Sequence, residues 1–283
     1  MPLDLDKIGA VTAPHQHAYD WKSQAVYALG IGARRGELAY LYEGRAGGLQ
    51  VFPSYAVVPA LGPVIELLEA SGANLAMVVH GGQKVVAHRP APPEATLVTV
   101  GTLAGIYDSK RFATIVIRTR SVLAGEPLFD TEWSIIVRDE GRFGGARLPA
   151  DREAIKPPKG REPSWTVEQA TLPEQALLYR VSGDTNPLHA DPAFAEKAGF
   201  AQGPILHGLC TFGFMARAAI ERHAAGDAAR LAALGAQFRR PVWPGDTLVT
   251  QGWDLEDGTV ALQVSAKGRP EPVVSNAWAR IAR

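Results

Sequence analysis

A short segment at residues 182–189, Ser-Gly-Asp-Thr-Asn-Pro-Leu-His, carries side chains that could do chemistry. It places a carboxylate (Asp184), a carboxamide (Asn186) and an imidazole (His189) close together in the chain. Pro187 restricts the backbone and favours an extended conformation in the residue before it. A carboxylate and an imidazole that reach the same water molecule can remove one proton and supply one. The segment therefore predicts a stiff loop that holds an acid–base pair.

The same segment could be an ordinary turn, because Asp, Asn and Pro are common where a chain changes direction. Two features favour the chemical interpretation. His189 ends the same segment, and a second cluster, Pro-Ile-Leu-His-Gly-Leu-Cys, follows at residues 204–210. The cysteine of this cluster, Cys210, lies in an apolar run and is expected to be a small core residue rather than a nucleophile.

The rest of the chain must position these groups, and its pattern predicts long antiparallel strands joined by tight turns. Runs rich in Val, Ile, Thr and aromatic residues occur in both halves, separated by Gly, Pro and Asp. The predicted strands span residues 85–88, 95–107, 113–123, 129–138, 233–241, 247–255, 259–267 and 273–282.

Three helices are predicted. The strongest spans residues 209–223, where apolar residues recur at spacings of three and four. Polar residues are scarce in it before Arg217, which predicts a deeply buried helix. A helix over residues 173–179 begins with proline, as helices often do, and a short one is predicted over residues 62–70.

A polar segment divides the chain in two. Residues 149–163 are rich in Pro and charged residues and poor in apolar ones, which is typical of a linker. We therefore expect one domain over residues 1–148 and a second over residues 164–283. No residue-level repeat relates the two halves.

Composition excludes several classes of function. The chain has 283 residues, and Lys+Arg and Asp+Glu are both 29, so no basic excess indicates a nucleic-acid partner or a membrane surface. No apolar stretch reaches the roughly 18 residues of a membrane span, and a single cysteine excludes an internal disulfide framework. The N-terminus lacks a signal-peptide pattern and the C-terminus lacks Ser-Lys-Leu, so the expected location is the cytoplasm.

Residues 179–189, followed by Asp191-Pro192 and by residues 204–208, resemble the hydratase 2 motif of the MaoC-like (R)-specific enoyl-CoA hydratases, which include the hydratase 2 unit of peroxisomal multifunctional enzyme type 2. The resemblance is dense in the second half and thinner in the first. It implies an α+β double hotdog fold, in which two antiparallel sheets, each wrapped round a central helix, pair edge to edge. It also implies reversible hydration of trans-2-enoyl-CoA to (3R)-3-hydroxyacyl-CoA, with CoA as part of the substrate and no cofactor.

The resemblance also implies catalytic roles. Asp184 and His189 would activate the water and protonate C2, although the sequence leaves open which is the base. Asn186 would position the water or one member of the pair. The amide of Gly208, at the start of a helix, would hold the charge that develops on the thioester oxygen; the alternative is that Gly208 only makes the turn. His207 is expected to have a structural role.

Substrate contacts are implied in both halves. His80 and Gly81 resemble a His-Gly pair that approaches the acyl-CoA, and Lys110 resembles a lysine that meets the CoA phosphates. The remaining predicted contacts lie in the second half: Pro187, Leu188 and Phe238. From the residues alone, an ordinary turn or solvated face is the favoured interpretation of His80, Gly81 and Lys110. Phe238 fits sheet core as well as it fits a ligand contact. Arg239 and Arg240 could hold phosphate, but solvent exposure is the favoured interpretation.

The first half has no second Asp-x-Asn-Pro-x-His segment. We therefore expect one active site per chain, with a degenerate first half that supplies acyl and CoA surface. The exposed sheet edges of this architecture make a homodimer the expected assembly.

Three alternatives remain at this point. A hotdog acyl-CoA thioesterase would also use a carboxylate and a polarised thioester, but it would release a thiol. A non-catalytic acyl-CoA binding protein would not need Asp184, Asn186, His189 and Gly208 together. Metal binding has little support, because His15 and His17 are the only closely spaced histidine pair and fit an exposed loop.

Overall fold

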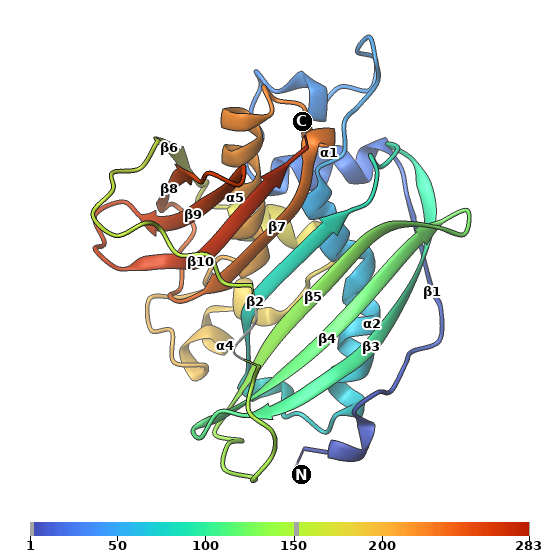
Figure 1. Cartoon of the computed structure of the whole chain (residues 1–283), viewed down its shortest axis with the longest axis vertical. Coiled ribbons are helices and arrows are strands. Elements are labelled where there is room, and N and C mark those ends of the chain that lie inside the picture. Colours follow the sequence, from blue (N-terminus) through green and yellow to red (C-terminus); the bar gives the residue numbers. More distant parts are fainter. Residues whose placement is uncertain (1–2, 150–152, 283) are drawn as a thin grey trace.

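The computed structural model describes residues 3–149 and 153–282. Ten strands form one continuous antiparallel sheet, with the order β1-β3-β4-β5-β2-β7-β10-β9-β8-β6 (Figure 1). The first-half strands are β1 (His15–Tyr19), β2 (Val78–Ala87), β3 (Ala95–Asp108), β4 (Phe112–Leu123) and β5 (Glu126–Arg138). The second-half strands are β6 (Trp165–Ala170), β7 (Leu231–Phe238), β8 (Thr247–Asp254), β9 (Thr259–Ala266) and β10 (Pro272–Ile281).

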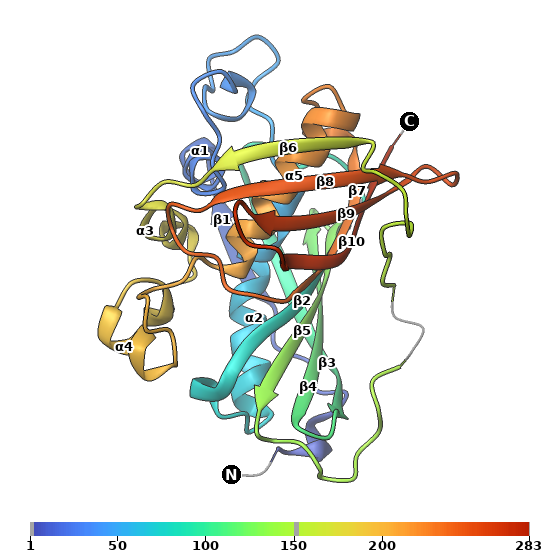
Figure 2. The same cartoon turned by 90° about the vertical axis from the view of Figure 1, so that its left-hand side faces the viewer.

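The two halves meet where β2 pairs with β7, from Gly82 opposite Gln237 to Val86 opposite Ala233. The two expected sheets are therefore joined into a single sheet by backbone hydrogen bonds. The helices are α1 (Trp21–Gly30), α2 (Val57–Ala70), α3 (Gln175–Tyr179), α4 (Pro192–Lys197) and α5 (Gly208–His223). Figure 2 shows α2 beside the first-half strands and α5 behind the second-half strands.

Helix α5 forms the core of the second half. Every residue from 209 to 220 is buried, as its apolar sequence predicts, and the helix packs against β6, β7, β8 and β10. Arg217 is the one charged residue in this stretch, and it forms an ion pair with Glu37 at 2.5 Å and donates to the carbonyl of Ile31 at 3.1 Å. The pairing keeps the buried charge satisfied.

Helix α2 packs against β3 and β4 and starts at Val57, before the start predicted at residue 62. The prediction was wrong at this end because Pro59, Gly62 and Pro63 weaken the helical pattern, although proline is tolerated in a first turn. Gly101 of β3 allows the close approach: a Cβ there would lie 3.0 Å from atoms of Leu67 and Pro63.

Strand β2 also starts earlier than predicted, at Val78 rather than at residue 85. Two glycines hide the strand pattern, and the register shifts between His80 and Gly82, so Gly81 forms a bulge. A Cβ on Gly81 would lie 2.8 Å from the side chain of Ile136. Bulges of this kind redirect side chains near functional sites.

Strands β1 and β6 and helices α1 and α4 were not predicted. Helix α1 and the loop after it pack on the second half, although they precede the boundary predicted from the linker. Gln175 donates to the carbonyls of Leu29 and Gly30 at 3.0 and 2.7 Å, and Cys210 donates to the carbonyl of Gly30 at 3.2 Å. The early chain thus covers the buried ends of α3 and α5.

The predicted linker has no helix or strand in its described part, and its residues 150–152 lie outside the described residues. Across residues 3–149 and 153–282, no helix is long and apolar enough to cross a membrane.

Candidate active site

A cavity of about 640 Å³ lies between the two halves. Its walls come from α2, β2 and β5 in the first half, and from the 183–189 loop, the start of α5 and the ends of β7 and β10 in the second. All the predicted site residues except Lys110 line it: Asp184, Asn186, His189, Gly208, His80, Gly81, Pro187, Leu188 and Phe238. The cavity therefore brings together residues that lie far apart in the sequence.

The loop owes its shape to local hydrogen bonds. Gly183 takes a φ of 129°, which side chains rarely permit, and ends a short 3₁₀ helix (Arg180–Ser182). The Asp184 carboxylate accepts from the Asn186 backbone N–H at 3.2 Å, and the side-chain Oδ1 of Asn186 accepts from the Leu188 N–H at 3.0 Å. The segment is therefore a turn that also lines the cavity. These local hydrogen bonds fix its conformation.

His189 is buried and has one ring nitrogen committed to the backbone. Its Nδ1 donates to the carbonyl of Ile205 at 2.8 Å, since a carbonyl can only accept. Nε2 therefore carries the lone pair when the ring is neutral. Burial lowers the pKa of His189, opposed by the charge of Asp184 and the bond to Ile205. A neutral imidazole with an open Nε2 is the form expected near neutral pH.

Asp184, His189 and His207 bring three titratable side chains together. One polar side-chain atom from each lies within 4.8 Å of those of the other two. One water molecule can therefore contact both the carboxylate and an imidazole. The rings of His189 and His207 stack with centroids 3.7 Å apart and an angle of 27°. Each ring also donates one N–H to a backbone carbonyl, His189 to Ile205 and His207 to Asp184.

His207 supports both members of the pair. It is fully buried, and its Nε2 donates to the backbone carbonyl of Asp184 at 3.1 Å while its ring covers His189. Burial, with the neighbouring His189, lowers the pKa of His207 to about 2, so the ring stays neutral. These contacts agree with the structural role expected for it.

Gly208 is the first residue of α5, and its amide has no hydrogen-bond acceptor among the described residues. The helix dipole adds positive potential at this position. A Cβ at Gly208 would lie 3.5 Å from the ring of Phe238, so the glycine leaves the amide open beside that ring. The arrangement can stabilise a negative oxygen in the cavity.

His80 lines the same cavity as the 183–189 loop, from the first half. Its Nε2 donates to the carbonyl of Gly82 at 3.0 Å, and its ring stacks on Trp133 and meets the edge of Phe238, both at 5.0 Å. Burial lowers the pKa of His80 to about 4, and the charge of Asp184 acts in the opposite direction. The ring is therefore neutral and offers Nδ1 as an acceptor.

The first-half wall of the cavity is mostly apolar. The sequence predicted that the first half supplies acyl surface, but it did not identify these residues as the wall. Ile65 and Leu75 remain 43% and 46% exposed although they are apolar. The helical pattern of α2 was too weak to show this face, because two prolines interrupt it and the sequence predicts only a short helix. The other apolar residues of this wall are Leu61, Val64, Leu68, Val78, Val79, Trp133, Ile135 and Ile136.

Lys110 does not line the cavity. It lies in the turn between β3 and β4 with a φ of 67°, and its N–H donates to the Asp108 carboxylate at 2.8 Å. Arg239 and Arg240 line the cavity instead, and they are exposed as expected.

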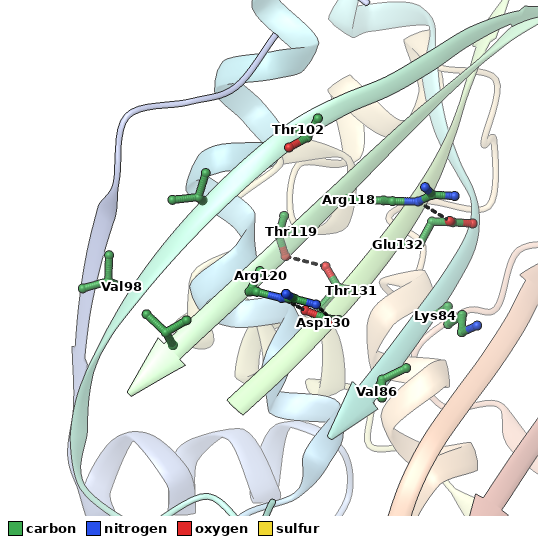
Figure 3. Close-up of a pocket in the computed structure, with 12 residues that line it drawn as sticks. Lys84, Val86, Val98, Thr102, Arg118, Thr119, Arg120, Asp130, Thr131 and Glu132 are labelled. Carbon is green, nitrogen blue, oxygen red and sulfur yellow. Dashed lines mark hydrogen bonds and ion pairs between the residues drawn. The ribbon is translucent and has the colours of Figure 1, made fainter. Parts of the chain in front are cut away.

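A second hollow, of about 680 Å³, lies on the opposite face of the first-half strands (Figure 3). Arg120 forms two bonds to Asp130 at 2.7 and 2.8 Å, and Arg118 pairs with Glu132 at 2.9 Å. None of the predicted catalytic or substrate-binding residues lines it. Arg118 and Arg120 thus pair with its two carboxylates, and Lys84 pairs with Glu153, which lies outside its wall.

Comparison of the chain with known proteins shows its family. Residues 154–273 match the MaoC like domain, and residues 17–139 match the MFE-2 hydratase 2 N-terminal domain. The chain is 38% identical to 3-hydroxyacyl-thioester dehydratase Y of Mycobacterium tuberculosis, over 95% of this chain and 93% of that protein. It is 37% identical to peroxisomal enoyl-CoA hydratase 2 of Arabidopsis thaliana, over 92% of this chain and 89% of that protein.

Solved structures agree on the fold. A MaoC-like dehydratase from Phytophthora capsici superposes with a TM-score of 0.89 at 30% identity, covering 99% of this chain and 98% of that one. A Mycobacterium tuberculosis protein described as a double hotdog superposes with a TM-score of 0.60 at 14% identity, covering 96% and 94%. The fold is therefore of the α+β hotdog type.

Proposed function

The chain belongs to the family of MaoC-like dehydratases and hydratase 2 enzymes, and from this premise we propose that it hydrates a trans-2-enoyl-CoA reversibly to a (3R)-3-hydroxyacyl-CoA. An enzyme of this family is a hydro-lyase. One observation carries the assignment of the site: the polar atoms of Asp184 and His189 lie within 4.8 Å of each other in the wall of the cavity that Gly208 also lines.

The Asp184–His189 pair handles the protons. Attack of water forms the C3–O bond, and one proton leaves the water as the C2=C3 electron pair moves toward the thioester carbonyl. One proton then arrives at C2 as the carbonyl forms again. The pair therefore ends in the protonation state in which it began. Only Nε2 of His189 can take part, because Nδ1 is bound to Ile205.

The amide of Gly208 stabilises the oxygen on which negative charge builds. A preorganised N–H aimed at such an oxygen is commonly a large catalytic contribution. Asn186 uses its carbonyl oxygen on the Leu188 amide, which leaves its NH₂ to orient the water or the Asp184 carboxylate.

The two halves contact different parts of the substrate. The second half carries the reacting groups, and the first half supplies the apolar wall of α2 and β2 for the acyl chain, with His80 and Gly81 near the thioester. Pro187, Leu188 and Phe238 line the second-half side of this path. One active site per chain follows, in a cytoplasmic homodimer. A monomer found in solution at micromolar concentration would contradict the assembly and leave the chemistry standing.

The decisive experiment follows the enoyl-thioester absorbance with crotonyl-CoA and trans-2-decenoyl-CoA, with chiral analysis of the product and an assay for free thiol. We expect the absorbance to fall without thiol release, and a 3R product. Release of one thiol per substrate would assign a thioesterase instead. Binding without any change in either signal would assign a binding protein.

A further inference from the structure

Buried polar groups without partners gather behind the 183–189 loop. Across residues 3–149 and 153–282, ten buried side-chain nitrogen or oxygen atoms have no hydrogen-bond partner. Six of the ten belong to α1, to the 3₁₀ helices that precede α2 and the 183–189 loop, and to the residue before α5: Gln24, Tyr27, Ser54, Arg180, Ser182 and His207. We call these six side chains the polar cluster. An unpaired buried polar atom costs free energy, so their concentration at one place requires an explanation.

Aromatic rings connect the polar cluster into one region. Tyr179 lies between its two ends, with its ring centroid 4.9 Å from that of His207 and 6.0 Å from that of Tyr27. The ring of Tyr27 in turn lies 5.2 Å from that of Tyr55, in the chain before α2. Helix α1 also packs against α3 (Figure 2) and against the 3₁₀ helix Arg180–Ser182.

His207 needs a hydrogen-bond donor at one end of the polar cluster. Burial, His189 and Arg180 lower the pKa of His207 to about 2, and the bond from Nε2 to the Asp184 carbonyl, at 3.1 Å, acts in the opposite direction. Nδ1 of this neutral ring carries a lone pair, but no donor in the described chain reaches it. The nearby Arg180 has an Nε–H that likewise lacks an acceptor. A water molecule that accepts from Arg180 and donates to His207 would satisfy both.

The other end of the polar cluster lies between α1 and the chain before α2. Tyr27 and Ser54 are 0% and 1% exposed, and neither hydroxyl has a partner among the described residues. Burial raises the pKa of Tyr27 and the Ser54 hydroxyl opposes this, so the two hydroxyls are neighbours although no direct bond joins them. Gln24, one turn earlier on α1, leaves its side-chain nitrogen unpaired as well. Internal waters usually make about three hydrogen bonds, which matches these three groups.

We propose that the polar cluster is a binding site for internal water molecules, and that these waters hold His207, and through it the Asp184–His189 pair, in the reactive arrangement. A donor on Nδ1 of His207 fixes the tautomer whose Nε2–H stays bonded to the Asp184 carbonyl. The same ring then stays stacked on His189. The positioning role rests on the proposed function, whereas the binding of water does not.

The sign of a stability change tests the water site. Tyr27→Phe and Ser54→Ala each remove one hydroxyl. If water bridges the two, each variant leaves a buried polar group unpaired, and the thermal midpoint should fall by several degrees. If the site is dry, each variant only removes an unpaired hydroxyl, and the midpoint should stay the same or rise. Thr250→Val is the matched control, because the Thr250 hydroxyl is buried and unpaired outside the polar cluster.

Water binding is refuted if neither Tyr27→Phe nor Ser54→Ala is less stable than the Thr250→Val control. A crystal structure gives a second readout. Water bonded to Nδ1 of His207 and to the Tyr27 hydroxyl would support the site, and direct bonds among the cluster side chains with no water between them would overturn it. Neither measurement depends on activity, so both decide the water site even if the protein hydrates no enoyl-CoA.

The positioning role is tested at Arg180. Arg180→Met removes the donor to the water beside His207, so kcat for enoyl-CoA hydration should fall about tenfold while KM stays near wild type, because small displacements of catalytic groups slow the chemical step. Arg180→Lys keeps a cationic donor and should restore much of the loss. Arg35→Met, which removes an exposed arginine elsewhere, is the control and should change neither constant. An unchanged kcat in Arg180→Met, or a loss confined to KM, would overturn the positioning role.

Discussion

The main helices of the two halves differ in how deeply they are buried. Helix α5 buries every residue from 209 to 220, whereas α2 leaves Ile65 largely exposed and lends one face to the cavity. The buried helix is fixed on all sides and can hold catalytic groups precisely. The half-covered helix leaves space that an acyl chain can fill. The second half thus supplies a rigid, buried helix, and the first half supplies a helix that leaves room beside the cavity.

The starts of the two helices differ as well. Helix α5 begins at Gly208, which lines the cavity and whose amide has no acceptor among the described residues. Helix α2 follows directly on a 3₁₀ helix, Pro53–Ala56, in which every residue is buried. The start of α2 is therefore covered by the preceding chain, and none of the residues that we propose as oxyanion donor or acid–base pair lies in the first half.

Of the variants proposed here, Asp184→Asn should lower kcat the most. The amide keeps the shape of the side chain but cannot take a proton, so kcat should fall by about 10³-fold or more. The thermal midpoint should change little, because Asp184 is not fully buried. Enoyl absorbance and a thermal melt on the same sample measure both quantities. Activity within a few-fold of wild type would remove Asp184 from the mechanism.

Gly208→Pro tests the helix start, with Gly208→Ala as its matched control. Proline removes the N–H but suits the first position of a helix, and His207 before it is already extended, with a ψ of 136°. We expect kcat to fall about 10²-fold with proline. Alanine keeps the N–H, and its Cβ would lie at ordinary contact distance from Phe238, so it should cost much less. Equal losses in the two variants would show that space, not the amide, matters.

The stability of the protein should depend on pH through two buried histidines, one in each half. Burial lowers the pKa of His80 to about 4 and that of His207 to about 2, below the ordinary value of about 6.5. Below pH ~6.5 the unfolded chain binds protons at these sites and the folded chain does not. The free energy of unfolding should therefore decrease as the pH is lowered below ~6.5, by up to about 1.4 kcal/mol per pH unit for each histidine.

Urea unfolding between about pH 7 and about pH 4 measures this slope. His80→Asn should reduce it, and carboxylate contributions cancel in the difference from wild type. An unchanged slope would mean that His80 is protonated in the folded protein.

The sequence predicted the second half better than the first, for physical reasons. Helix α5 is uniformly apolar at helical spacing, and the 182–189 segment keeps its polar groups in one short loop. In the first half, Gly81 and Pro63 disguise β2 and α2, because a bulge and an internal proline break the periodicities on which prediction depends. The apolar cavity wall depends on packing between halves, which no local pattern encodes. The packing of α1 on the second half escaped prediction for the same reason.

Ile65→Phe should have the smallest effect and should sharpen the contrast between the halves. The ring adds bulk on the cavity face of α2 at a position that is now 43% exposed, so the fold should tolerate it. KM for trans-2-decenoyl-CoA should rise several-fold, since a few lost methylene contacts cost about 1–2 kcal/mol. KM for crotonyl-CoA and kcat for both should stay near wild type, because we expect a four-carbon chain to end before Ile65. If the two substrates lose equally, the acyl chain does not run along α2, and the division of labour between the halves must be redrawn.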